Sequence, residues 1–262
     1  MQESHWNLVF DLHGVLADVK AVNRNYGDYL EKILVPTGMK REEIIEIHDF
    51  AFKNWITEIT QLFNEFDECK RRNINSEVFM RKYKLIDSKW EQYILNNVPI
   101  EHKKAVKPFL KTSLVEYEAL AKGSNPILYP EVNSVLTELA KISHLHMHIA
   151  SSASSRHVKG AVALHNLKGI FQELIGYDTV KAPKKASSGE YFKRMLDIIK
   201  TIPERVIFVG DSIEEAILTT TLGMKFVLVW RKDSELKDIP KGRFEIINNL
   251  TTLLSIIKTI LK

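Results

Sequence analysis

The sequence predicts an α/β fold: a doubly wound parallel sheet with helices on both faces, interrupted by an all-helical insertion. From residue 128 onward, short apolar runs alternate with helical stretches, as in consecutive strand–helix–strand units. These runs are apolar throughout, which is expected of strands buried on both faces. Residues 18–127 carry apolar side chains at three- and four-residue spacing and read as almost all helix.

The first element is a short strand, residues 8–10, that ends abruptly at Asp11. The helical stretch 18–127 follows, with Ser76 and Asp87 at positions typical of helix N-caps. Its many aromatic side chains are expected to form the core of a helical bundle, although a few could face a substrate. The sequence does not tell which.

Four more strands are expected in the last part of the chain, separated by helices. The C-terminal stretch "FEIINNLTTLLSIIKTILK" is predicted to be one amphipathic helix packed on the sheet rather than on a membrane, because its polar face holds only two lysines. In a Rossmann-like sheet of this kind, ligands bind at the carboxyl ends of the strands. The predicted strands are 145–150, 173–177, 206–210 and 226–230, and the helices are 132–141, 156–165, 189–201 and 214–222.

The bulk composition excludes several classes of function. The chain has 262 residues, enough for one large or two smaller domains, and a net charge of +4 from 37 basic and 33 acidic residues. This charge is too small to indicate a nucleic-acid partner, and the sequence shows no basic stripe with interleaved aromatic residues. No stretch approaches the ~20 apolar residues that span a bilayer. A single cysteine, Cys69, and the lack of a signal-peptide pattern predict a cytoplasmic protein, whose oligomeric state stays open.

Polar residues follow three of the predicted strands. Asp11, Ser151 and Asp211 stand directly after them, so we expect all three at one crevice, with Glu215 one helical turn beyond Asp211. Two or three carboxylates repel one another unless a cation offsets them. Carboxylate oxygens together with a substrate phosphate suit Mg²⁺. The sequence therefore predicts a magnesium site at this edge.

A phosphate would find partners beside these carboxylates. Ser151 and Ser152 open a predicted helix, where hydroxyl and backbone N–H groups suit a phosphate oxygen. A lysine ahead of the helix near residue 189 would balance the negative charge, and the candidates are Lys181, Lys184 and Lys185.

Four stretches, in order, resemble the motifs of the haloacid dehalogenase-like hydrolase superfamily: "VFDLHGVLAD", "HIASSAS", "KKASSGEYF" and "VIFVGDSIEEA". The resemblance covers residues 1–17 and 128–262, which would form the catalytic core. Residues 18–127 would be a helical cap inserted after the first motif. In position and helicity this cap resembles those of phosphoglycolate-phosphatase-like and β-phosphoglucomutase-like members.

The resemblance implies a role for each matching residue. Asp11 would be the nucleophile that forms an aspartyl-phosphate and would also bind Mg²⁺. Asp211 would be a side-chain metal ligand, and Glu215, where the family often has Asp, would orient the metal or its waters. Ser151, with Ser152 beside it, would donate to the transferring phosphoryl group.

Lys185 is the first choice for the phosphate-stabilising lysine of the third motif, although its spacing to "EYF" is slightly longer than the family's usual pattern. Lys184 is the second choice and Lys181 the third.

His13 departs from the family pattern. The family's hydrolases have a second Asp there, which protonates the leaving oxygen and later deprotonates water, while its main-chain carbonyl binds the metal. The carbonyl of His13 would still serve Mg²⁺, and imidazole is a common general base, but nearby Mg²⁺ disfavours the imidazolium needed as an acid. Family members without this Asp include dehalogenases, phosphonoacetaldehyde hydrolases and cation-pumping ATPases. The dehalogenases lack the Gly-Asp-Ser motif found here.

The favoured hypothesis is a Mg²⁺-dependent phosphohydrolase of a small phosphorylated metabolite, with His13 as a variant acid/base. Two alternatives rest on the same residue. One is a degenerate member that binds a phosphorylated ligand or a partner without turnover. The other is a phosphotransferase whose aspartyl-phosphate hydrolyses slowly.

Overall fold

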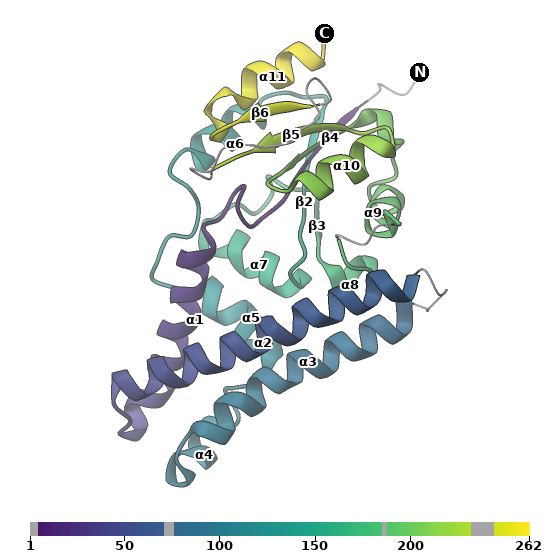
Figure 1. The fold of residues 1–262 in the computed structure, drawn as a ribbon. Coiled ribbons are helices and arrows are strands. Elements are labelled where there is room, and N and C mark those ends of the chain that lie inside the picture. Colours follow the sequence, from purple (N-terminus) through teal and green to yellow (C-terminus); the bar gives the residue numbers. More distant parts are fainter. Residues whose placement is uncertain (1–4, 71–75, 185–187, 232–243) are drawn as a thin grey trace. The chain divides into compact units, whose positions relative to one another are not determined.

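The structure is a computed structural model that describes residues 5–70, 76–184, 188–231 and 244–262 (Figure 1). The chain divides into two compact units, named here the sheet unit and the helical unit. The sheet unit is Met1–Val19, Ile127–Val158 and Asn166–Lys262, and the helical unit is Lys20–Pro126 and Lys159–His165. The assignment of residues 18–127 as a cap that serves a catalytic core stays a prediction.

In the part of the chain that the structure describes, the sheet unit is built on six parallel strands in the order β3-β2-β1-β4-β5-β6. This confirms the predicted doubly wound sheet. The chain starts at the centre with β1, runs outward through β2 and β3, and returns to add β4, β5 and β6 on the other side. The switch point between β1 and β4 is where such folds bind ligands. The strands are β1 (Trp6–Phe10), β2 (Leu145–Ala150), β3 (Glu173–Ile175), β4 (Val206–Gly210), β5 (Lys225–Val229) and β6 (Glu245–Ile247).

Helices cover both faces of this sheet (Figure 1). Helix α9 shows why they pack there: Tyr191, Phe192 and Met195 fall on one side of it and are fully buried against Phe208 of β4. The rings of Phe192 and Phe208 meet edge to face with centroids 5.4 Å apart. The helices of the sheet unit are α6 (Val132–Leu139), α8 (Tyr177–Val180), α9 (Glu190–Ile199), α10 (Ile213–Thr221) and α11 (Leu253–Ile260). Helix α7 (Ser155–Leu164) begins in the sheet unit, and its part from Lys159 onward belongs to the helical unit.

The prediction for the C-terminal stretch was wrong in part. Glu245–Ile247 forms strand β6, and only Leu253–Ile260 forms a helix. The adjacent β-branched residues Ile246 and Ile247 favour the strand. Asn249 then breaks it, because its side chain accepts a hydrogen bond from the backbone N–H of Thr251 at 2.9 Å and opens a 3₁₀ turn.

Among the described residues, the helical unit contains the long helices α2 and α3, which pack along each other, three shorter helices, and the part of α7 from Lys159 onward. Its core includes Trp90, and Trp55 packs against this core, as the aromatic pattern predicts. Asp87 does not cap a helix: α3 continues through it, and Asp87 instead accepts a hydrogen bond from the Trp55 indole N–H at 3.1 Å. No helix among the described residues is long and apolar enough to cross a membrane. The helices are α1 (Val19–Leu34), α2 (Arg41–Lys70), α3 (Ser76–Asn97), α4 (Ile100–Val106) and α5 (Thr112–Ala121).

Candidate active site

Asp11 ends the central strand and remains attached to the sheet. Its backbone N–H donates to the carbonyl of Val209 at 2.8 Å, which extends the β1–β4 pairing by one residue. Its Oδ1 accepts a hydrogen bond from the N–H of Leu12 at 2.7 Å. The chain then closes a tight loop, in which the N–H of Ala17 donates to the carbonyl of Leu12 at 2.7 Å. The Asp11 carboxylate is therefore held in place at the sheet edge.

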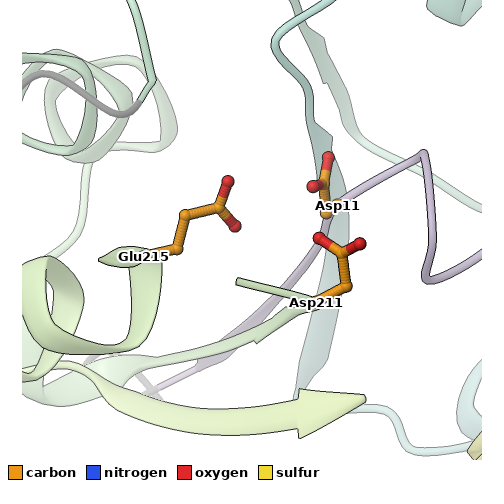
Figure 2. A group of neighbouring side chains, drawn as sticks. All are labelled: Asp11, Asp211 and Glu215. Atoms are coloured by element: carbon orange, nitrogen blue, oxygen red, sulfur yellow. The ribbon is translucent and has the colours of Figure 1, made fainter. Parts of the chain in front are cut away.

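Three carboxylates meet at the switch point. Asp11 follows β1, Asp211 follows β4, and Glu215 lies in the first turn of α10; one oxygen from each lies within 4.8 Å of the others. Figure 2 shows the three side chains turned toward a common space. Asp11 and Glu215 are buried, so their mutual repulsion is poorly screened by water. The sequence predicted this convergence from the strand ends.

Lys184 is the cation of this cluster. Its Nζ lies 2.8 Å from Oδ2 of Asp11 and 3.2 Å from Oε1 of Glu215, and its side chain is fully buried. Burial alone would lower the pKa of Lys184, but the charges of Asp11 and Glu215 outweigh it and raise that pKa above 10.5. Lys185, the first choice from the sequence, lies outside the described residues. Lys181 is exposed at the end of α8.

Gly14 makes room for the cluster. Its φ is +76°, a left-handed conformation that favours glycine. A Cβ at this position would lie 2.2 Å from Oδ2 and 2.7 Å from Cγ of Asp211. Any side chain here would therefore displace the Asp211 carboxylate from its place beside Asp11.

Arg231, which the sequence did not single out, clamps the loop after Asp11. Its guanidinium donates to the carbonyls of Gly14 at 3.2 Å and Val15 at 3.1 Å, and lies 3.7 Å from the ring centroid of Tyr129. It also pairs with Glu131 at 2.6 Å. Burial alone would raise the pKa of Glu131, but hydrogen bonds, above all that from Arg231, hold it below its usual value. An arginine after β5 forms no recognisable motif, so only the fold reveals this contact.

Ser151 ends the strand next to that of Asp11, since β2 pairs with β1 through Phe10 and Ile149. It is buried, its N–H donates to the carbonyl of Ile175 at 2.9 Å, and its Oγ accepts from the N–H of Ala153 at 3.1 Å. A hydroxyl that accepts in this way still carries a proton that it can donate. Ser152 is half-buried beside it.

His13 faces a second histidine. Its Nε2 lies 3.0 Å from Nε2 of His157 in α7, and the two rings meet edge to face. Burial lowers the pKa of His13, aided by the charge of Lys184 and opposed by that of Asp11. Burial also lowers the pKa of His157, well below 6.5, and His13 adds to the shift. Nothing in the sequence pattern pointed to His157.

The donor set fits a hard divalent cation. Asp11, Asp211 and Glu215 supply oxygen ligands only, which Mg²⁺ prefers. Counted over the described residues, these carboxylates and the ammonium of Lys184 have formal charges of three negative and one positive. The surplus of two negative charges is the amount that one divalent ion neutralises.

One comparison with known proteins identifies a family. The chain matches the sequence model of haloacid dehalogenase-like hydrolases over residues 7–218. No curated protein sequence matched this one. Among solved structures, L-2-haloacid dehalogenase from Xanthobacter autotrophicus is 15% identical, with 97% of this chain and 99% of that chain covered and a TM-score of 0.60.

Two further solved structures are similar over almost the whole chain. The HAD hydrolase YfnB from Bacillus subtilis, bound to magnesium, is 16% identical, with 98% of this chain and 100% of that chain covered and a TM-score of 0.61. A HAD phosphatase from Thermococcus onnurineus is 15% identical, with 96% of this chain and 97% of that chain covered and a TM-score of 0.55. At these identities the likeness concerns the fold alone.

Proposed function

This chain belongs to the haloacid dehalogenase-like hydrolase family, and we propose that within it the protein is a Mg²⁺-dependent phosphohydrolase of a small phosphorylated metabolite. The observation that carries the proposal is the cluster of Asp11, Asp211 and Glu215, in which the buried Asp11 and Glu215 pair with Lys184. Mg²⁺ would be held by these three carboxylates and by the main-chain carbonyl of His13.

The cluster favours phosphoryl transfer over dehalogenation. Displacement of a halide from carbon by a carboxylate uses a substrate of one negative charge and needs no metal. Three carboxylates with one ammonium would repel such an anion, whereas a site that binds a divalent cation attracts a phosphate. The likeness to dehalogenases at 15% identity concerns the fold and does not oppose this reading.

In the proposed reaction, Asp11 attacks phosphorus as the bond to the ester oxygen breaks, and that oxygen takes up a proton and leaves as the alcohol. Water then hydrolyses the aspartyl-phosphate, which releases inorganic phosphate and restores Asp11. Lys184 orients the Asp11 carboxylate through the 2.8 Å contact and screens its charge as the anionic substrate approaches. The hydroxyl of Ser151 donates to a phosphoryl oxygen. Bound Mg²⁺ would supply Lewis-acid stabilisation of the charge that develops on phosphorus.

In this proposal the imidazolium of His13 would give a proton to the leaving oxygen, and its neutral imidazole would later take one from water. Because burial lowers the pKa of its imidazole, the neutral ring suits the second task better than the first. His13 is also the observation that favours the second candidate: a protein that binds a phosphorylated ligand without turnover, or that keeps its aspartyl-phosphate long enough to pass the phosphoryl group on.

The test is a panel of sugar and organic phosphates with MgCl₂, run beside a panel of 2-haloacids without metal. We expect phosphate release that needs Mg²⁺ and is lost in Asp11→Asn. The matched control, Asp197→Asn on the exposed side of α9, should keep wild-type turnover. Halide release without metal would replace the proposal by a dehalogenase.

A second experiment separates the hydrolase from the other candidates. If His13 is a working acid/base, His13→Asp lowers or preserves an activity that the wild type already has. If the wild type is silent and His13→Asp switches hydrolysis on, the natural chain is a binding form. A long-lived phosphate on Asp11, detected by mass spectrometry after rapid quenching, would indicate the phosphotransferase.

A further inference from the structure

The imidazole of His13 is paired with that of His157, to which the mechanism above gives no task. The Nε2 atoms of the two rings lie 3.0 Å apart, the ring planes cross at 71°, and the centroids are 4.9 Å apart. A separation of 3.0 Å between two nitrogens is a hydrogen bond, so one Nε2 carries a proton and the other accepts it.

His157 is the better anchored of the two rings. It is 8% exposed and lies in the first turn of α7, where its backbone N–H donates to Oγ of Ser154 at 3.1 Å. The next turn begins with Val158, which is fully buried and donates its N–H to the carbonyl of Ser154. The start of α7 is fixed further by Asp178, whose carboxylate accepts two hydrogen bonds of 2.7 Å from Ser155.

His13, in contrast, lies in the loop after β1 and is half-buried. A carboxylate at this position would present two equivalent oxygens. An imidazole presents two different nitrogens that point in different directions, so its orientation and its tautomer both decide what it can do. A ring in this loop therefore needs a fixed partner if one particular nitrogen is to face the reacting atoms.

We propose that His157 is a positioning residue: it binds Nε2 of His13 and thereby selects Nδ1 as the nitrogen that serves the reaction. The kinetic part of this inference rests on the proposed phosphohydrolase function, and the hydrogen bond itself does not. Since only one Nε2 of the pair carries a proton, the two neutral rings hold opposite tautomers. Whichever of the two arrangements forms, Nε2 of His13 is occupied.

The kinetic test compares three variants of the full chain. His157→Leu removes the partner nitrogen, and we expect kcat to fall about 10- to 100-fold with KM changed by less than about threefold. His157→Gln keeps a polar group that can bind Nε2 of His13 and should recover kcat to within about fivefold of wild type. The matched control is His148→Gln: His148 is also buried, but its Nε2 binds Asn7 instead. It should leave kcat unchanged.

Equal losses of kcat in His157→Leu and His157→Gln, or no loss of kcat in His157→Leu, would overturn the inference.

The second test needs no turnover. In full-length protein with ¹⁵N-labelled histidine, we expect NMR to show His13 and His157 as opposite tautomers joined by a nitrogen–nitrogen coupling across the hydrogen bond. The coupling should vanish in His157→Gln. If the coupling is present but no phosphate ester is hydrolysed, the proposed function fails and the pairing stands. If hydrolysis is present but both rings show one tautomer and no coupling, the pairing is overturned and the function stands.

Discussion

The two units of this protein differ in the kind of side chain that they bury. In the helical unit, buried side chains are mostly apolar, and ion pairs such as Lys82–Glu65 lie at the surface with about half of each side chain exposed. In the sheet unit, Lys184, Asp11 and Glu215 form an ion cluster with little or no contact with solvent. Taking charges out of water costs several kcal/mol per ion, so a fold gains nothing from this arrangement unless a ligand or a reaction uses it. The comparison indicates which unit carries the chemistry.

The largest expected contrast comes from removing one lysine in each unit. Lys184→Met leaves two buried carboxylates without their cation, so we expect a loss of about 3–5 kcal/mol in the free energy of unfolding, together with loss of turnover. Lys82→Met breaks an exposed pair and should cost less than about 1 kcal/mol.

Urea denaturation of both variants, with and without MgCl₂, measures this contrast. A divalent cation replaces part of the lost positive charge, so added MgCl₂ should raise the midpoint of Lys184→Met more than that of the wild type. Equal destabilisation by the two substitutions would show that the buried cluster is no more demanding than a surface pair.

The second contrast concerns pH and the buried histidines. Burial, with a smaller contribution from His146, lowers the pKa of His148 in β2 from 6.5 to about 4. In the unfolded chain His148 therefore binds a proton as the pH falls through 6.5, whereas in the folded chain it does so only near pH 4. The stability linked to neutral His148 is complete above pH 6.5 and falls by about 3 kcal/mol as the pH drops to 4.

His148→Gln removes this titration and keeps a group that can bind Asn7, so the unfolding free energy of the variant should depend less on pH between 6.5 and 4. In the helical unit, burial also lowers the pKa of His48, but its hydrogen bond to Asp49 opposes the shift. His48→Gln should therefore flatten the pH profile less. A steeper effect at His48 would contradict the ranking.

The strand ends could be predicted from the sequence because the argument is local. Apolar runs indicate the strands, and the geometry of parallel sheets brings the residues after them to one edge. The structure brings Asp11 and Asp211 together there, with Glu215 beside them in the first turn of α10. The lysine could not be chosen in the same way. Lys184 and Lys185 are consecutive in the sequence, and the spacing to the next motif does not resolve a shift of one residue. The ion pair between Lys184 and Asp11 becomes visible only in the fold.

Other features depend on contacts between distant parts of the chain. His157 meets His13 across 144 positions, and Arg231 reaches Gly14 across 217. Neither residue belongs to a local pattern. The assumed cap at Asp87 failed for the same reason: its carboxylate binds Trp55 of another helix, so α3 had no need to begin there.

The smallest contrast comes from replacing glycine by alanine, which we expect to lower the stability of the sheet unit and to raise that of the helical unit. Gly14→Ala forces a side chain onto a residue at φ +76° and into contact with Asp211, so we expect a loss of about 1–3 kcal/mol and a turnover at least about tenfold lower. Gly27→Ala lies within helix α1, where the nearest atom to the new Cβ, Nδ1 of His48, is 4.0 Å away. Alanine there should stabilise the helical unit by about 0.5–1 kcal/mol, because glycine is the weaker helix former. Thermal unfolding and phosphatase assays of both variants measure the two effects. If Gly14→Ala keeps full activity, the position of the Asp211 carboxylate is not what the reaction depends on, and the metal site proposed around it is wrong.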